Sequence, residues 1–265
     1  MKHQRKHLMR LFAAAAVFSM SLSAGCGRQK PETAGRETDP LPVLEALEGE
    51  KPQEAKRLAV SCCVRLDVAG EEAEYYGSGV VWDQKDGRLI IATAGHLLKE
   101  GEVLRVVFYD GTAAQGRSLG VSDTLDVGFV EADWQGAVTG SDRTGNEDGL
   151  TPALVSLHQR RFDTLDGYSP LFVAAGTQDG CADMILDASL LEKAWYREEF
   201  GSDVMILSCD TQAGASGAGV FDGCGNFVGL VLGGAEGKTA VLSMEQVNQA
   251  YDEVCGSRRV TDDYP

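Results

Sequence analysis

Histidine is scarce in this chain of 265 residues, and so are groupings of metal-ligating side chains. Four histidines are present, and two of them, His3 and His7, lie among the first ten residues. That leaves His96 and His158 for chemistry that needs an imidazole. The sequence has no Cys-x-x-Cys pair and no Cys/His cluster with the spacing of a metal site. A metal-dependent hydrolase is therefore disfavoured, and we expect neither a metal nor an organic cofactor.

Positive charge is also in short supply. The chain has 24 basic and 40 acidic residues, a formal net charge of −16. Removing residues 1–25 would take away four basic residues and no acidic one, which leaves 20 against 40 and a net charge of −20. A surface this acidic repels the phosphates of nucleic acid and of anionic lipid headgroups. We expect no nucleic-acid partner.

No apolar run is long enough for a membrane span, which takes about 20 residues. The run at residues 11–24 has 14 residues and follows a basic stretch, the pattern of a signal peptide over residues 1–25. Its end, "LSAGC", resembles the lipobox of bacterial lipoproteins, which implies a lipid on Cys26. The alternative is an ordinary cleaved secretion signal. We expect an extracytoplasmic protein, anchored to the bacterial cell membrane through Cys26 or secreted if Cys26 carries no lipid.

The remaining cysteines predict disulfides, because an oxidising compartment favours them. Six are left: Cys62, Cys63, Cys181, Cys209, Cys224 and Cys255. Their connectivity cannot be deduced from the sequence. Cys209 and Cys224 stand on either side of Ser216, and a bond between them would brace the loops around that serine, so this pair is our first expectation.

The organisation of the chain changes at residue 58. Residues 26–57 are rich in charge and proline and read as a tether. Short apolar runs with turn signals then follow, which predicts an all-β fold. A polar, glycine-rich stretch at residues 136–149 divides it into two halves, 58–140 and 141–265. Within the second half, we expect "SLLEKAWYREEF" to form a short helix or a loop. Ser243 and Gln246 form a capping-box pattern that predicts a C-terminal helix.

Ser216 lies between glycines and is the candidate nucleophile. An α/β-hydrolase is excluded because no histidine follows Ser216 and because Ala218 breaks the Gly-x-Ser-x-Gly motif. A subtilisin-type hydrolase could use an earlier acid such as Asp83, but that fold needs alternating helices and parallel strands. Instead His96 ends an apolar strand, and Asp126 begins another and needs a partner to offset its desolvation.

The segments "GSGVVWD", "TAGH", "LDVGFV" and "GASGAGVFD" with "GNFVGL" resemble those of trypsin-like serine endopeptidases. The closest variety is the compact bacterial type related to the high-temperature-requirement proteases. The resemblance implies two perpendicular six-stranded β-barrels, a chymotrypsin-like fold, with the active site between them. It makes His96 the general base, Asp126 the orienting acid and Ser216 the nucleophile, with the N–H groups of Gly214 and Ser216 as the oxyanion hole. A peptide or protein would be the substrate.

Some positions bear on activation and specificity. Ala215 replaces the aspartate that pairs with a freed N-terminus in digestive trypsins, so that switch is expected to be absent. Asp210 precedes Ser216 by six residues, the offset of the acid in the trypsin pocket, although it could equally be a turn residue. The pocket strand is expected to include Gly229, Leu232, Gly233 and Gly234. The alternative function is a catalytically silent lipoprotein of this type that binds peptides or a partner protein.

Overall fold

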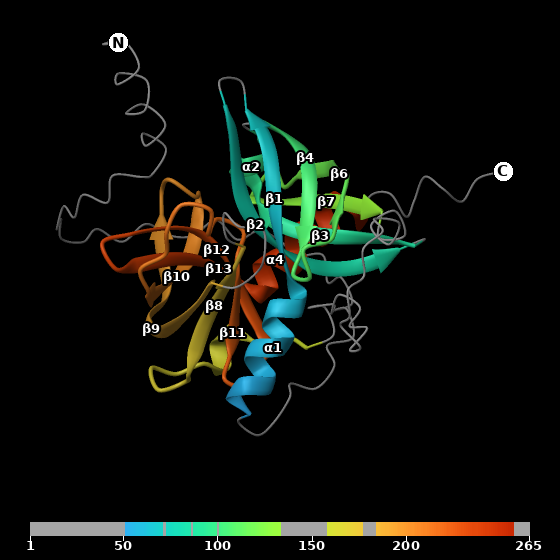
Figure 1. Cartoon of the computed structure of the whole chain (residues 1–265). Coiled ribbons are helices and arrows are strands. Elements are labelled where there is room, and N and C mark those ends of the chain that lie inside the picture. The colour runs from blue at the N-terminus through green and yellow to red at the C-terminus, as the bar shows by residue number, and fades with distance from the viewer. Residues whose placement is uncertain are drawn as a thin grey trace, which may run out of the picture.

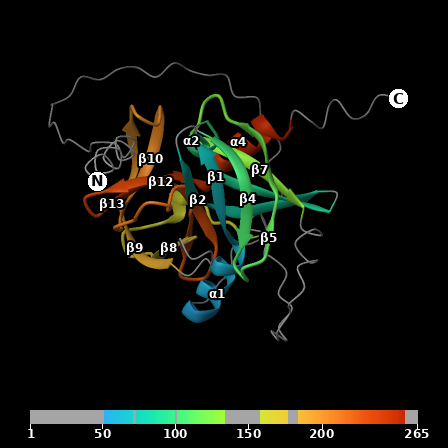
Figure 2. The same cartoon turned by 45° about the horizontal axis from the view of Figure 1, so that its top comes forward.

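The computed structural model describes residues 51–70, 73–85, 87–99, 101–133, 158–176 and 184–256. Within them the chain forms two β-structures that lie side by side in both views (Figures 1 and 2), with helices α1 and α4 packed where they meet. The predicted signal peptide, Cys26, Cys181 and the glycine-rich stretch at residues 136–149 lie outside the described residues. None of the helices in the described part has the length and apolarity needed to cross a bilayer.

The N-terminal β-structure is a seven-stranded antiparallel sheet in the order β5-β4-β1-β2-β3-β7-β6. Its strands are β1 (Cys63–Gly70), β2 (Glu74–Lys85), β3 (Arg88–Ala94), β4 (Gly101–Phe108), β5 (Ala113–Ala114), β6 (Gly116–Val121) and β7 (Val127–Asp133). The sheet curls so that β6 approaches β4, although these strands are not neighbours in the strand order. A Cβ on Gly116 of β6 would lie 2.5 Å from Val103 of β4. A curled sheet thus stands where a closed six-stranded barrel was expected.

The C-terminal β-structure is a closed six-stranded barrel in the order β10-β13-β12-β11-β8-β9. Its strands are β8 (Leu171–Ala175), β9 (Met184–Arg197), β10 (Ser202–Ser208), β11 (Gly219–Asp222), β12 (Phe227–Ala235) and β13 (Lys238–Ser243). The stretch "SLLEKAWYREEF", predicted as a helix or a loop, belongs mostly to β9 and pairs with β10. The all-β, chymotrypsin-like prediction is confirmed.

Helical segments complete the described part of the fold. The described helices are α1 (Pro52–Cys62), α2 (Gly95–Lys99), the 3-10 turn η2 (Phe162–Thr164) and α4 (Met244–Val254). The capping box predicted at the start of α4 is present, with Ser243 and Gln246 bonding each other's backbone N–H groups. The apolar runs that follow residue 58 were expected to be strands, but the first of them is wrong, since α1 runs to Cys62 and β1 begins only at Cys63.

An aromatic core joins the two β-structures. Trp82 of β2 meets Phe227 of β12 edge to face at 5.5 Å between ring centroids. Tyr251 of α4 meets Phe129 of β7 in the same manner at 5.3 Å. Trp82, Phe227 and Phe129 are fully buried. Truncating a side chain of this kind to alanine typically costs about 3–5 kcal/mol, so the relative position of the two β-structures is strongly held.

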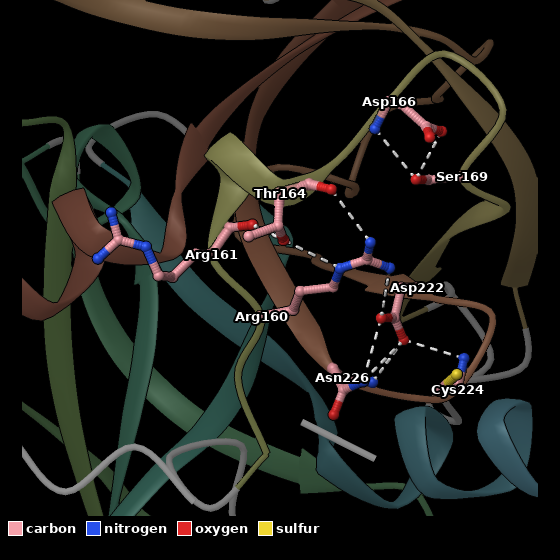
Figure 3. Close-up of polar contacts among 8 residues, drawn as sticks. All are labelled: Arg160, Arg161, Thr164, Asp166, Ser169, Asp222, Cys224 and Asn226. Atoms are coloured by element: carbon pink, nitrogen blue, oxygen red, sulfur yellow. Dashed lines mark hydrogen bonds and ion pairs between the residues drawn. The ribbon is translucent and has the colours of Figure 1, made fainter. Parts of the chain in front are cut away.

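The hairpin between β11 and β12 is fixed by a buried carboxylate. Asp222 accepts hydrogen bonds from the backbone N–H groups of Cys224 and Asn226, both at 2.9 Å, and from the side chain of Asn226. Arg160 donates to the same carboxylate at 3.2 Å and also reaches Thr164 (Figure 3). The charge of Asp222 is thus compensated inside the barrel wall, and the segment before β8 is tied to this turn.

Candidate active site

His96 and Asp126 are brought together by the pairing of β3 with β7. Ala94 pairs with Val127 at one end of these strands, so the residues just beyond each strand lie side by side. Asp126 Oδ2 lies 2.7 Å from His96 Nδ1, and Asp126 Oδ1 accepts from the backbone N–H of His96 at 2.7 Å. A carboxylate can only accept, so Nδ1 carries the proton. The neutral ring then has a lone pair on Nε2, as a general base requires.

The close approach of Asp126 depends on the glycine before His96. Gly95 donates its N–H to the Asp126 carbonyl at 3.0 Å. A Cβ on Gly95 would lie 2.7 Å from Val121 and 3.0 Å from Asp126 Oδ1. Any larger residue would push the acid away from the imidazole. The absence of a side chain at Gly95 therefore lets the Asp126 segment approach His96.

Ser216 sits in a loop that presses against β2 and β3. The Ser216 carbonyl accepts from the backbone N–H of Ser78 at 2.8 Å. Gly217 has φ +85°, and a Cβ there would lie 2.0 Å from the Ser78 carbonyl oxygen and 2.4 Å from Thr93 Oγ1. Thr93 is three residues before His96. The loop of the candidate nucleophile therefore contacts the strands that lead to the candidate base, and only glycine fits at the contact.

The Ser216 hydroxyl donates to the Leu232 carbonyl at 3.1 Å. Within the described residues it makes no hydrogen bond to His96. Rotation about one side-chain bond reorients a serine hydroxyl, and catalytic hydrogen bonds are often absent before substrate binds. The N–H groups of Gly214 and Ser216 donate to no acceptor in the described part of the chain, so both are available to a ligand.

A comparison with known protein families matches residues 77–230, more than half of the chain, to the trypsin-like peptidase domain. The chain belongs to the trypsin-like peptidase family. The matched segment contains His96, Asp126 and Ser216. A comparison with curated proteins finds no match.

Two solved structures share this fold. The chain is similar to the HtrA-type protease AlgW with a tripeptide, at 15% identity and a TM-score of 0.59, over 78% of this chain and 64% of that one. It is similar to AlgWS227A with a tripeptide at 15% identity and a TM-score of 0.58, over 75% and 62%. The chain thus spans less than two thirds of either protein. At this identity the likeness shows the trypsin-like fold and nothing finer.

The predicted pocket residues of this trypsin-like domain lie on two segments that touch. Leu232, Gly233 and Gly234 belong to the second half of β12. A Cβ on Gly234 would lie 2.2 Å from Thr211 Oγ1, and Thr211 Oγ1 lies 3.1 Å from Thr239 Oγ1. Asp210 is exposed. Gly229 lies earlier in β12, paired with Val220 and Ser243. The roles of these residues in substrate binding stay predictions.

The expected disulfide between Cys209 and Cys224 is wrong. Cys209 follows β10, and its N–H donates to the Gly237 carbonyl at the β12–β13 turn. Cys224 lies in the β11–β12 turn. The two cysteines are therefore at opposite ends of the nine-residue strand β12, whereas a disulfide needs Cα atoms less than about 7 Å apart. Among the described cysteines the structure has no disulfide.

Three residues that support the trypsin-like site were missed from the sequence. Tyr76 and Ser78 of β2 both bond carbonyls of the Ser216 loop. Glu253 of α4 bonds the loop that carries Asp126. Ser78 was visible only as part of the family motif "GSGVVWD". Nothing in the sequence marks Tyr76 or Glu253, because their partners are more than 125 residues away.

Proposed function

We propose that this protein is a serine endopeptidase that hydrolyses peptide bonds through Ser216, His96 and Asp126. The observation that carries the proposal is the double hold of Asp126 on His96, through Nδ1 and through the backbone N–H, each at 2.7 Å. It is supported by the contact between the Ser216 loop and the strands before His96. A structural role alone would not require a histidine with Nδ1 committed to a carboxylate while Nε2 has no hydrogen-bond partner among the described residues.

The chemistry then proceeds in two halves. Ser216 Oγ turns from Leu232 and attacks the peptide carbonyl while His96 Nε2 takes its proton. The oxyanion is stabilised by the N–H groups of Gly214 and Ser216, and His96 gives the proton to the leaving amine. Water, deprotonated by His96, then releases the acyl group from Ser216. Asp126 stays ionised and holds the imidazole in one tautomer throughout.

A second candidate function is a protein that binds peptides or a partner without turnover. The observation that favours it is the hydrogen bond from the Ser216 hydroxyl to the Leu232 carbonyl. A serine that stayed in this orientation could not pass its proton to His96. Peptide binding would still be possible along β12.

Labelling with a fluorophosphonate separates the two candidates, because this probe reacts only with activated serines. The chain without residues 1–26 would be labelled beside Ser216→Ala and His96→Ala, with the exposed Ser208→Ala as the matched control. We expect the parent and Ser208→Ala to be labelled and the other two to be silent. An unlabelled parent that still binds peptides would support the binding protein. Labelling that survives Ser216→Ala would disprove the proposed nucleophile.

We further propose that the protein acts outside the cytoplasm, anchored to the bacterial membrane by a lipid on Cys26. The support is the sequence pattern alone: a basic start, an apolar run and small residues before Cys26. Labelling of cells with a radioactive fatty acid, with Cys26→Ser as the control, tests it. Incorporation that is unchanged in Cys26→Ser would disprove the anchor, and a protein found unlabelled in the medium would indicate secretion.

A further inference from the structure

The orientation of one peptide bond decides whether Gly214 can serve an oxyanion. In a trans peptide the carbonyl and the following N–H point in opposite directions. The N–H of Gly214 therefore points to the side of the loop opposite the Ala213 carbonyl. A group that holds the Ala213 carbonyl on one side of the loop directs the Gly214 N–H to the other side.

Tyr76 is that group. Its hydroxyl donates to the Ala213 carbonyl at 3.4 Å. Its ring lies directly against Gly214, since a Cβ on Gly214 would be 2.1 Å from Tyr76 Cε2. Gly214 has φ +93°, in the left-handed region that favours glycine. The contact with the Tyr76 ring therefore leaves no room for a side chain at position 214.

Ser78 holds the next carbonyl from the same strand. Its hydroxyl donates to the Gly214 carbonyl at 2.7 Å and accepts from the backbone N–H of Gly176 at 2.9 Å. Residues two apart on a strand lie on one face, so Tyr76 and Ser78 present their hydroxyls to consecutive carbonyls. Ser78 is completely buried. Its single donor is committed, because loss of that bond would leave a buried carbonyl unsatisfied.

The second oxyanion donor is oriented differently. The N–H of Ser216 is opposite the Ala215 carbonyl, which accepts from the N–H of Ala218 at 2.9 Å. That bond lies within the loop itself. The peptide between Ala213 and Gly214 is the central one of a turn that is closed by the Ala215 N–H on the Gln212 carbonyl at 3.1 Å. Such a turn allows either orientation of its central peptide, and the hydroxyls from the N-terminal sheet contact the orientation observed, whereas the Ser216 N–H is oriented within the loop. Ala215, buried and uncharged, can form no ion pair with a freed N-terminus.

We propose that Tyr76 and Ser78 are positioning residues that hold the peptide bond between Ala213 and Gly214 with its N–H toward the substrate. The oxyanion hole is then assembled by β2 of the other β-structure and needs no activating cleavage. This proposal rests on the proposed function, in which Gly214 stabilises the oxyanion. It places neither residue in contact with substrate.

Steady-state kinetics on a fluorogenic peptide test the proposal. Tyr76→Phe keeps the ring and removes one hydrogen bond, so we expect kcat to fall by about twofold to tenfold with KM unchanged. Combining it with Ser78→Ala should lower kcat by about a hundredfold, close to the loss of one oxyanion donor. The affinity of a peptide aldehyde, which forms the tetrahedral adduct, should fall in parallel. Tyr168→Phe, an exposed tyrosine, is the matched control.

Two outcomes would overturn the proposal. One is an unchanged kcat in the double variant. The other is a loss of activity that is explained wholly by a higher KM and a lower stability of the double variant. Crystal structures of the parent chain and the double variant provide a test that does not depend on turnover. We expect the peptide bond after Ala213 to rotate only in the double variant, and an unrotated bond would refute the proposal. An inactive, unlabelled parent would disprove the proposed function, while these structures would still decide the role of β2.

Discussion

Asp126 holds His96 with both of its carboxylate oxygens, one on the imidazole Nδ1 and one on the backbone N–H, each at 2.7 Å. The first bond fixes the tautomer, and the second fixes the position of the ring relative to the backbone. Asp126→Asn would keep the shape but offer an N–H to the ring, which leaves the proton on Nε2. The serine would then lack a base.

We therefore expect Asp126→Asn to lower kcat by about 10⁴-fold, as loss of the acid does in Ser-His-Asp triads, with little effect on folding. The measurement is the initial rate of peptide cleavage, with the melting temperature of each variant. Asp123→Asn, an exposed acid three residues earlier, should retain full activity. A tenfold loss or less in Asp126→Asn would mean that this acid does not orient the base.

Glu253 of α4 supports the loop that delivers Asp126. Its carboxylate accepts from Ser122 Oγ at 2.6 Å and from the backbone N–H of Asp123 at 2.7 Å. The Ser122 hydroxyl also accepts from the N–H of Leu125 at 3.0 Å, the residue before Asp126. The C-terminal helix thus reaches the proposed orienting acid, Asp126, through one short chain of hydrogen bonds.

We expect Glu253→Ala to lower kcat by about threefold to tenfold, since it removes charge-assisted hydrogen bonds worth about 1.5–3 kcal/mol each, of which only part is lost to catalysis. Glu253→Gln should recover part of the rate. Asp252→Ala, exposed on the same helix, is the control. The loss should lie in kcat and not in KM, and equal rates in Glu253→Ala and Asp252→Ala would refute the link.

The residues of the proposed triad could be chosen from the sequence because each stands beside a local signal. His96 ends an apolar strand, Asp126 begins another, and Ser216 lies among glycines. The supporting residues could not, since Tyr76 reaches Ala213 across 137 positions and Glu253 reaches Ser122 across 131. Hydrogen bonds over such separations leave no periodicity or spacing in a single sequence. They depend on how the two β-structures pack.

The two elements that were predicted wrongly have different physical causes. In α1, Ala55, Ala59 and Cys62 are buried one helical turn apart, but the helix contains Val60, which favours a strand, and it runs directly into β1. In β9, alternating burial is broken where the strand bulges against β10. "SLLEKAWYREEF" therefore lacks the clear period of two by which strands are recognised.

Substitution of Asp222 tests the stability of the fold without touching the proposed catalytic residues. It is almost completely buried and is bonded to Arg160, Asn226 and the turn backbone (Figure 3). Removing Asp222 takes the acceptor from the buried Asn226 side chain and from two N–H groups of the turn, and an unsatisfied buried group typically costs about 1–3 kcal/mol. We expect that loss for Asp222→Ala in urea unfolding. Asp187→Ala, an exposed acid, is the control, and a loss below about 1 kcal/mol would contradict the prediction.

The buried cysteines predict how stability depends on pH. Burial raises the pKa of the Cys63 thiol from 9.0 to about 12, and it raises the pKa of Cys62 as well. Between these values the unfolded chain releases the thiol proton and the folded chain keeps it, so stability falls as the pH rises above about 9. The contribution is present in full below pH 9. Cys63→Ala should reduce this fall between pH 9 and 11, measured by urea unfolding, and an unchanged slope would refute it.

The contact between Thr211 and Gly234 predicts a preference for small side chains at the cleaved position. Thr211 Oγ1 would lie 2.2 Å from a Cβ on Gly234, and Thr211 Oγ1 also pairs with Thr239 Oγ1 at 3.1 Å. The segment that contains Thr211 therefore contacts the segment that contains Gly234, and this contact lies between Ser216 and Asp210, which is exposed. A long lysine or arginine side chain would have to separate them to reach that acid.

A peptide library should therefore show cleavage after alanine or valine in preference to lysine, arginine or phenylalanine. Thr211→Gly removes the contact, and each methylene that then fits is worth about 0.8 kcal/mol, or about fourfold in kcat/KM. We expect this variant to gain cleavage after leucine, whereas Asp210→Ala should change nothing. A parent that prefers arginine and loses that preference in Asp210→Ala would show that the segments part in solution and that Asp210 forms the floor of the pocket.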